Sequence, residues 1–231
     1  MKTLGIIGGI GPESTIDYYR SLIATYRQES ADGSNPSIVI NSVDMPRMLA
    51  MFEANEFGKV AEYLVGELQR LAAAGADFGL LAANTPHIVF DEIQRRSPIP
   101  LISIVQAMCA AAKARGLKRL GLFGTRYTMR ARFYADVFSN EGIALSVPEP
   151  DQQDYIHDKY MSELVKGIFL PETREGLLAI VDRLAAREKI EGLILGGTEL
   201  PLILRDAEHH GIPFLDTTQI HVRAAVARLL A

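Results

Sequence analysis

The chain has 231 residues, of which 48% are hydrophobic and 23% charged, as in a globular protein with a substantial core. Its formal net charge is −4 and it has no long basic run, which argues against nucleic acid or an anionic membrane as the main partner. The single cysteine, Cys109, excludes an intramolecular disulfide and a cysteine-cluster metal site. The N-terminal apolar run is too short for a signal peptide, and no segment has the length of a membrane span, so a cytoplasmic location is predicted.

Apolar runs in the first half of the chain each precede a pattern typical of a helix. They are LGIIGG, PSIVINS, FGLLAAN and PLISIV. Continuous apolar runs indicate strands that are buried on both faces, and their alternation with helices indicates a parallel sheet. The sequence therefore predicts an α/β fold.

The second half of the chain repeats this scheme. KTLGIIGG from Lys2 matches KRLGLFGT from Lys118, GLLAANT matches GLILGGT, and PLISIVQ from Pro100 matches PFLDTTQ from Pro213. The three matches occur in order and at nearly one spacing. They predict two similar α/β lobes related by a pseudo-twofold axis.

The predicted first lobe contains residues 1–105 and 213–231, and the second contains 106–212. In this interpretation the last helix returns to the first lobe. Ligands of open α/β sheets bind beyond the carboxyl ends of the strands. We therefore expect a single site in the cleft between the lobes, lined by equivalent loops from each half.

The stretch IIGGIGPEST reads as a strand, a glycine turn at Gly9 and Gly11, and a helix with Pro12 in its first turn. Exposed backbone N–H groups at such a turn favour a small anion, here a carboxylate. A purely structural tight turn is the alternative. A dinucleotide site is disfavoured, because G-x-G-x-x-G is absent and Glu13 would bring negative charge towards a pyrophosphate.

Two basic residues follow predicted elements at places that could meet an acidic ligand. Arg47, in NSVDMPRM, follows the second strand, and arginine suits a bidentate contact with a carboxylate. Lys166 precedes a glycine in ELVKGIF. Taken alone, Arg47 is better interpreted as a surface or ion-pair residue, and Lys166 as a solvated helix charge.

Polar residues follow the third strand of each predicted lobe. Asn84 and Thr85 end a strand in the first half, and Thr198 and Glu199 hold the equivalent place in the second. Asn84 and Thr85 could cap the following helix or hold a substrate carboxylate. Glu199 is the best-placed carboxylate in the chain and could equally cap a helix or take part in chemistry. His87 is interpreted as a structural polar group, with a general base as the alternative.

Hydroxyl donors could also come from Thr125, Tyr127 and Thr128, which follow the second-lobe counterpart of the glycine turn. Cys109 lies in the alanine-rich helical pattern VQAMCAAAKA. A buried small hydrophobic residue is therefore predicted there rather than a nucleophile.

Taken together, GIIGGIGPESTIDYY, MPRM, ANTPH, LFGT, LVKGIF and GGTELPLI resemble the aspartate/glutamate racemase family. The resemblance covers essentially the whole chain and is to the aspartate racemase and broad-specificity amino-acid racemase branch. It implies two flavodoxin-like lobes around the site, a homodimer, and chemistry without pyridoxal phosphate or a metal. It also implies two cysteines on opposite sides of the substrate α-carbon, one before Asn-Thr and one between Gly and Thr-Glu.

The chain departs from that pattern at both cysteine positions, which are occupied by Ala83 and Gly197. Neither residue can accept or donate a proton. The resemblance further implies that Arg47 and Lys166 hold the second carboxylate of an acidic substrate. Hydroxyl and amide groups at Asn84, Thr85, Thr125 and Thr198 would suit stabilisation of an enediolate.

We therefore expect a scaffold that handles a small, acidic amino acid, with two-base racemisation lost or very weak. Glu199, His87 or a bound water could substitute weakly. Three alternatives stay open: a binding protein for an amino acid or dicarboxylate without chemistry, a lyase, decarboxylase or hydrolase on the same scaffold, and an active racemase whose cysteines have been substituted by engineering.

Overall fold

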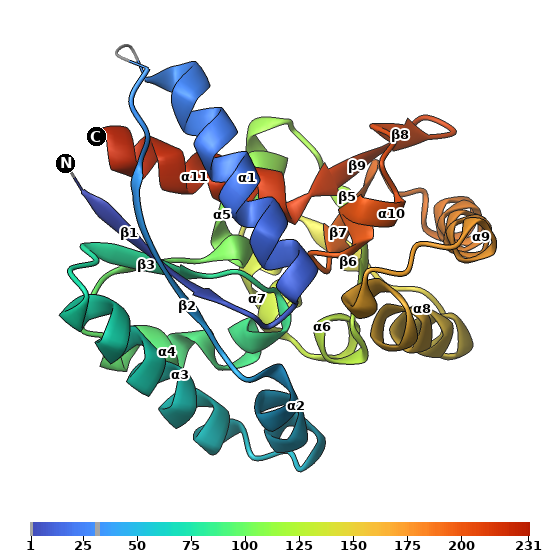
Figure 1. Ribbon diagram of the computed structural model, residues 1–231. Coiled ribbons are helices and arrows are strands. Elements are labelled where there is room, and N and C mark those ends of the chain that lie inside the picture. The colour runs from blue at the N-terminus through green and yellow to red at the C-terminus, as the bar shows by residue number, and fades with distance from the viewer. Residues whose placement is uncertain (1, 31–32) are drawn as a thin grey trace. The chain divides into compact units, whose positions relative to one another are not determined.

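A computed structural model describes residues 2–30 and 33–231, and it divides into two compact units. The first lobe runs to Ile104 and also includes His221–Ala231, while the second is Val105–Ile220. Figure 1 shows the helices and strands of each. Among the described helices, none is both long and apolar enough to cross a membrane.

The elements up to the end of the first sheet alternate between strands and helices, as the apolar runs predict. They are β1 (Thr3–Gly8), α1 (Pro12–Glu29), β2 (Ser37–Ser42), α2 (Met45–Glu53), α3 (Phe57–Ala73), β3 (Phe78–Leu81), the 3-10 helix η1 (Thr85–Val89), α4 (Phe90–Arg96) and β4 (Leu101–Ile102).

Within the described residues, the first sheet has four parallel strands in the order β2-β1-β3-β4. Strands β1 and β3 are central and almost fully buried, because helices cover both faces of the sheet. On one face, Tyr18 and Leu22 of α1 pack with Leu4 and Ile6 of β1. On the other, a Cβ at Gly5 would lie 2.9 Å from that of Ala76, so glycine lets the chain that follows α3 approach the strand.

The elements of the second half repeat this alternation. They are α5 (Ile104–Ala114), β5 (Arg119–Gly124), α6 (Arg126–Arg130), α7 (Phe133–Ser139), β6 (Ala144–Ser146), α8 (Pro150–Ser162), the 3-10 helix η2 (Leu164–Lys166), α9 (Pro171–Glu188), β7 (Gly192–Gly196), α10 (Leu200–Ile203), β8 (Glu208–His209), β9 (Ile212–Asp216) and α11 (Thr217–Leu230).

The second sheet, as far as the structure describes it, has the strand order β6-β5-β7-β9-β8. Its first four strands are parallel and follow the same order as those of the first sheet, which is the symmetry that the sequence repeats predict. Strand β8 is an antiparallel addition at the edge. The two-lobed α/β architecture with parallel sheets is therefore confirmed.

The predicted second boundary, at residue 213, is wrong. Strand β9 pairs in parallel with β7, and the Thr217 hydroxyl donates to the carbonyl of Leu195 at 2.8 Å. Residues 213–220 therefore belong to the second lobe. Helix α11 starts there and joins the first lobe from His221, where Val222 and Val226 pack against the core that contains Leu4.

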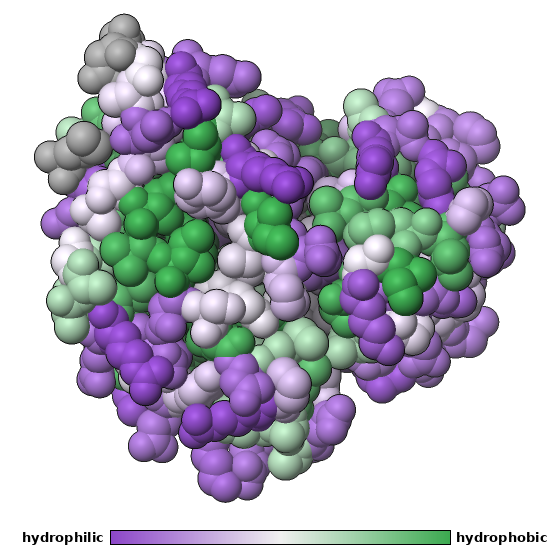
Figure 2. Space-filling view, in the orientation of Figure 1, coloured by the Kyte–Doolittle hydropathy of each residue, from purple (hydrophilic) through white to green (hydrophobic). Residues whose placement is uncertain are grey.

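On the face of the molecule in Figure 2, hydrophobic residues gather in patches among polar ones. Three large hydrophobic side chains at the edge of the first lobe are exposed. They are Ile16 and Tyr19 on α1 and Ile40 on the edge strand β2. Exposed apolar residues are common singly, but a group on neighbouring elements is typical of an interaction surface.

A buried hydrogen-bond network fixes α11 in the first lobe. The Nδ1 atom of His221 lies 3.0 Å from the hydroxyl of Tyr18, and its Nε2 lies 2.9 Å from the carbonyl of Ile102. The carbonyl can only accept, so Nε2 carries the proton and Nδ1 accepts from Tyr18. Burial lowers the pKa of His221 from 6.5 to about 4, so the ring is neutral.

We predict that the free energy of unfolding falls as the pH is lowered below about 6.5. In that range the unfolded chain binds a proton at His221, whereas the folded chain, with its lower pKa, does not. The loss has a limiting slope of about 1.4 kcal/mol per pH unit for one histidine. Urea unfolding between pH 7.5 and 5 should therefore show a shallower pH dependence for His221→Gln than for the unmodified chain. Parallel pH profiles for the two would contradict this assignment.

Candidate functional site

The glycine turn after β1 is fixed by its own hydrogen bonds. Gly9 has a φ of 78°, and a Cβ there would lie 2.4 Å from Oγ of Ser42, so only glycine fits. Its N–H donates to Oγ1 of Thr15 at 2.8 Å, and the hydroxyls of Ser14 and Thr15 donate to the carbonyl of Gly11. The structural interpretation therefore accounts for Gly9, and anion binding at this turn stays a prediction.

Arg47 lies in the first turn of α2, which Asp44 caps by accepting from the N–H of Arg47 at 3.2 Å. The guanidinium stacks over the ring of Tyr63, 4.6 Å from its centroid. The Tyr63 hydroxyl in turn accepts from the N–H of Asp44 at 3.2 Å. Within the described part of the chain, no carboxylate forms an ion pair with this exposed guanidinium, so its charge is oriented and open to a ligand.

Ala83 and Asn84 follow β3 and are both buried. Asn84 precedes η1, yet its side chain makes no capping hydrogen bond, so the capping alternative is wrong for this residue. Thr85 begins η1 and is half-buried. The loop thus presents a methyl group at Ala83, at the position where the resemblance places a cysteine.

His87 connects that loop to the end of the first sheet. Its Nε2 accepts from the N–H of Ile104 at 3.2 Å, so Nδ1 carries the proton and donates to the carbonyl of Ala83 at 3.1 Å. Burial, reinforced by His221, lowers the pKa of His87 from 6.5 to about 3. Both ring nitrogens are engaged in backbone hydrogen bonds, so His87 is a structural residue and not a general base.

In the second lobe, Thr125 follows β5 and caps α6 through its Oγ1, which accepts from the N–H of Thr128 at 3.2 Å. Thr128 is fully buried. Tyr127 is half-buried and packs edge-on against the ring of His157 on α8, with centroids 6.4 Å apart. The Nδ1 of His157 accepts from the N–H of Arg126 at 3.2 Å, which links α8 to the turn after β5.

Lys166 ends the 3-10 helix η2 instead of lying within a regular α-helix, and it is exposed. Gly167 follows in the left-handed region with a φ of 72°, and its N–H donates to the carbonyl of Leu164 at 3.0 Å. Across the described residues, no carboxylate forms an ion pair with Lys166. Its role as a carboxylate ligand stays a prediction.

A neighbouring tyrosine leaves no room for a side chain at Gly197. A Cβ at Gly197 would lie 2.5 Å from Cε2 of Tyr160 on α8 and 3.0 Å from its hydroxyl. The φ of Gly197 lies outside the left-handed region, so the backbone would accept any L-residue. The Tyr160 ring therefore fills the space that a cysteine side chain would need.

Tyr160 is held there by Glu199. Its hydroxyl donates to Oε2 of Glu199, which also accepts from the hydroxyl of Thr198 at 3.1 Å. Burial and the Glu199 carboxylate raise the pKa of Tyr160 well above 10, so its hydroxyl keeps its proton. Glu199 makes no capping hydrogen bond to α10, and the capping alternative is wrong here too.

Sequence reasoning missed Tyr160 and His157, although their spacing offered a signal. Gln153, His157 and Tyr160 recur at intervals of four and three residues, which places them on one face of α8. Ile156 on the same helix belongs to the second-lobe core. The pattern could not show that this face meets the loops after β5 and β7.

Cys109 does not supply the missing thiol. It is buried on α5 in the second lobe, and its Sγ donates to the carbonyl of Val137 at 3.9 Å. Burial, together with the negative charge of Glu141, raises the pKa of the thiol. Cys109 is therefore a packed, neutral side chain, as its alanine-rich pattern predicts.

Comparisons with known proteins agree on one family. The family model described as Asp/Glu/Hydantoin racemase matches residues 7–225. The chain is 24% identical to the broad specificity amino-acid racemase RacX of Bacillus subtilis, over 99% of this chain and 98% of that protein.

Solved structures of similar proteins cover the whole chain. An aspartate racemase homologue from Pyrococcus horikoshii superposes with a TM-score of 0.83 at 32% identity, and both chains are covered in full. A chain from Yersinia pestis, provisionally named an Asp/Glu racemase, superposes with a TM-score of 0.89 at 31% identity, again in full. The glutamate racemase of Francisella tularensis, solved with D-glutamate, shares the fold with a TM-score of 0.72 at 15% identity, over 99% of this chain and 81% of that one.

We predict that Gly197→Cys destabilises the protein, because its Cβ would overlap the Tyr160 ring. Overpacking of this kind costs about 1–3 kcal/mol in the free energy of unfolding. Replacing Tyr160 by Ala in the same chain should relieve the overlap, so the double variant should lose less stability than the two single losses combined. Urea unfolding of the four proteins in this cycle measures the coupling. Strictly additive losses would mean that Tyr160 does not occupy the space beside Gly197.

Proposed function

This chain belongs to the Asp/Glu/hydantoin racemase family, and on that premise we propose that it binds a small, acidic amino acid but does not racemise it by the family's two-cysteine route. The substrate would be held by loops that follow parallel strands, where open α/β sheets bind ligands. The observation that carries the proposal is the Tyr160 ring, which fills the place of a side chain at Gly197.

Racemisation has a strict stereochemical requirement. Inverting the α-carbon through a planar carbanion needs a base on one face and a proton donor on the other. Ala83 and Gly197, which match the two cysteine positions of the resemblance, offer a methyl group and a hydrogen atom. The loss of each proton-transfer group removes a factor of about 10²–10⁴ in rate.

His87 and Cys109, which could replace a missing cysteine as a base, already form hydrogen bonds with backbone groups. Both nitrogens of His87 hold backbone groups, and its low pKa keeps it neutral. The Cys109 thiol bonds to a backbone carbonyl within the packing of α5. Neither side chain can serve as a base without breaking a contact that holds the fold together.

An acidic substrate is supported by the basic residues. Arg47 presents a charge that is oriented by Tyr63 and lacks an ion-pair partner among the described residues. Asn84, Thr85, Thr125 and Tyr127 would provide neutral donors for the α-carboxylate, beside the N–H groups after Gly9 and Gly11. The Thr198 hydroxyl already donates to Glu199, and Thr128 is fully buried, so neither is available to a substrate. Lys166 would add a second charge for the side-chain carboxylate. The broad specificity named for RacX makes neutral amino acids the competing ligands to test.

A second candidate function, proton exchange on one face of the substrate, is favoured by the Tyr160–Glu199 pair. Glu199 is a buried carboxylate beside the second cysteine position, and Tyr160 provides a protonated hydroxyl in contact with it. The Glu199 carboxylate could take a proton from the α-carbon, exchange it with solvent and return a proton to the same face. The centre would not be inverted, because Ala83, at the other cysteine position of the resemblance, has no group that could donate a proton.

The proposal needs no pyridoxal phosphate or metal, and it places the protein in the cytoplasm as a homodimer. The homodimer is supported by the exposed Ile16, Tyr19 and Ile40, which give the first lobe an apolar surface on α1 and β2. Sedimentation equilibrium of the full chain tests the assembly. A monomer at all concentrations would remove that part of the proposal.

We expect no racemisation of L- or D-aspartate or glutamate in D₂O. Chiral chromatography measures the enantiomer ratio, and mass spectrometry measures deuterium at the α-carbon. Deuterium that enters with inversion at enzymic rates would refute the proposal, whereas deuterium with retention would select the one-face candidate. Release of ammonia or CO₂ would instead identify a lyase or decarboxylase. A variant with Ala83→Cys, Gly197→Cys and Tyr160→Ala is the matched control in which inversion should reappear.

We expect calorimetry to detect binding of aspartate or glutamate, and Arg47→Gln to weaken it at least tenfold, since a bidentate charge-assisted contact would be lost. Arg95→Gln, on α4 and also exposed, is the matched control and should bind like the unmodified chain. If Arg47→Gln binds aspartate or glutamate as tightly as the unmodified chain does, Arg47 is not part of the binding site.

A further inference from the structure

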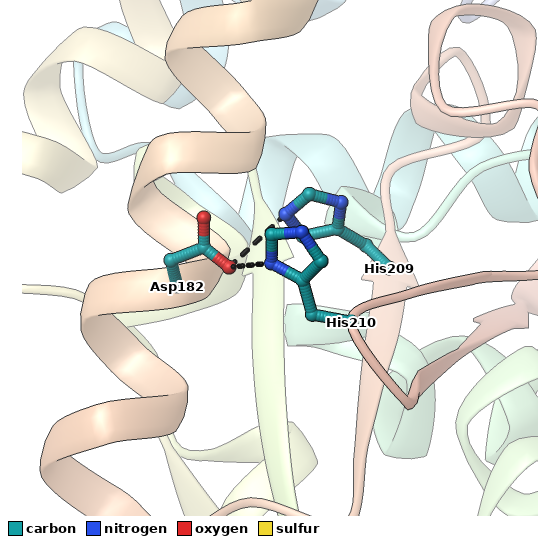
Figure 3. Close-up of side chains that lie close together, drawn as sticks. All are labelled: Asp182, His209 and His210. Atoms are coloured by element: carbon teal, nitrogen blue, oxygen red, sulfur yellow. Dashed lines mark hydrogen bonds and ion pairs between the residues drawn. The ribbon is translucent and has the colours of Figure 1, made fainter.

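Two histidines and an aspartate converge on the surface of the second lobe, away from the loops described above. Figure 3 shows Asp182 projecting from α9 towards His209 of β8 and His210 of the turn that follows. Oδ1 of Asp182 lies 3.0 Å from Nε2 of His209 and 3.0 Å from Nδ1 of His210. All three donor atoms lie within 4.8 Å of one another.

The backbone brings the two histidines together at some cost. His209 pairs with Ile212, so His210 and Gly211 form a two-residue hairpin loop. Their φ angles of 48° and 77° are both positive, as a type I′ turn requires. Asn-Gly is the favoured sequence for such a turn, and a non-glycine residue in the left-handed region is uncommon, although histidine is among the residues enriched there. The turn therefore tolerates His210 but does not require an imidazole.

The elements that carry the three side chains are anchored in the core. Ile180 and Val181, the residues just before Asp182 on α9, are buried in the second-lobe core. Strand β8 pairs with β9, which in turn pairs with the central strand β7. The ligand atoms thus project from a fixed helix and a fixed hairpin, which preorganises them.

The arrangement fits a small divalent cation better than an isolated ion pair. Zinc binds histidine nitrogen and carboxylate oxygen at about 2.0–2.2 Å, so neighbouring ligands on a tetrahedral ion lie about 3.3–3.5 Å apart. The two separations of 3.0 Å between Asp182 and the histidines would need to widen by only a few tenths of an ångström to reach these values. An exposed ion pair alone would contribute little to stability.

The site is also accessible to an ion. The side chains of Asp182 and His210 are 47% and 75% exposed, so an ion can approach from their side. His209 is 18% exposed, and its Nε2 atom is buried without a hydrogen-bond partner among the described residues. An aspartate is ionised at neutral pH, as a carboxylate ligand of a metal must be.

We propose that Asp182, His209 and His210 bind one divalent transition-metal ion of the zinc type, with water completing its coordination. Two imidazoles and one carboxylate match the ligand preference of zinc and exclude a calcium or magnesium site, which would need more oxygen ligands. The ion joins α9 to the β8–β9 hairpin. It is separate from the amino-acid site and does not depend on the proposed function.

Calorimetric titration of the chelator-treated full chain with zinc chloride at pH 7.5 tests the proposal. One equivalent should bind, and the midpoint of thermal unfolding should rise with zinc concentration, because the ion binds the folded state. His210→Asn and Asp182→Asn should each weaken binding at least tenfold. His210→Asn restores the favoured Asn-Gly turn, so its loss of binding cannot be assigned to misfolding.

Glu208→Gln is the matched control, since it removes an exposed carboxylate from the same hairpin but none of the three ligands, and it should bind zinc normally. Cobalt(II) gives a second measurement, because its visible absorption reports tetrahedral or five-coordinate binding and should be absent in His210→Asn. The proposal is overturned if no stoichiometric binding occurs, or if zinc binds the His210 and Asp182 variants as tightly as the unmodified chain.

Discussion

The Tyr160 hydroxyl donates to the Glu199 carboxylate, and this hydrogen bond holds the tyrosine ring against the α-carbon of Gly197. The contact couples two residues that are 39 positions apart and come from different elements. It leaves no room for a side chain at Gly197, although the backbone there is ordinary. A protonated phenol and a carboxylate thus stand where the family resemblance places a thiol. The chemistry open to this lobe follows from that exchange, since a phenol with a raised pKa keeps its proton and acts as a hydrogen-bond donor, which leaves the Glu199 carboxylate as the group that could accept a proton.

The two lobes share a strand order but differ in the polar groups that they bury. In the first lobe, His87 and His221 are neutral and bonded to backbone groups, and they connect the β3 loop, β4 and α11. In the second lobe, the buried polar centre is the Tyr160–Glu199 pair. Buried polar groups need hydrogen-bond partners, so each of these two sets holds the segments that bond to it in place. The same strand order therefore surrounds two buried histidines in one lobe and a buried tyrosine–carboxylate pair in the other.

The cluster of Asp182, His209 and His210 arises from the one place where the second sheet departs from the repeat. The first sheet ends, over the described residues, at β4, whereas the second adds the antiparallel strand β8 and its tight turn. That addition carries both histidines, and α9 supplies the aspartate. A metal ion there would connect β8, which has no counterpart in the first sheet, to α9, which contributes to the second-lobe core.

The sequence by itself determined the α/β class, the repeat, and that Ala83 and Gly197 directly follow strands. These features could be predicted because apolar periodicity and the residues at strand ends are local properties. The sequence also predicted the buried role of Cys109. Only the tertiary structure decided four features. They are the lobe to which residues 213–220 belong, the hydrogen bonds of both His87 nitrogens, the place of the Tyr160 ring beside Gly197, and the contact of Asp182 with the hairpin that carries the two histidines. Each depends on contacts between segments far apart in the chain, and the packing that selects such contacts leaves no periodic trace in the sequence.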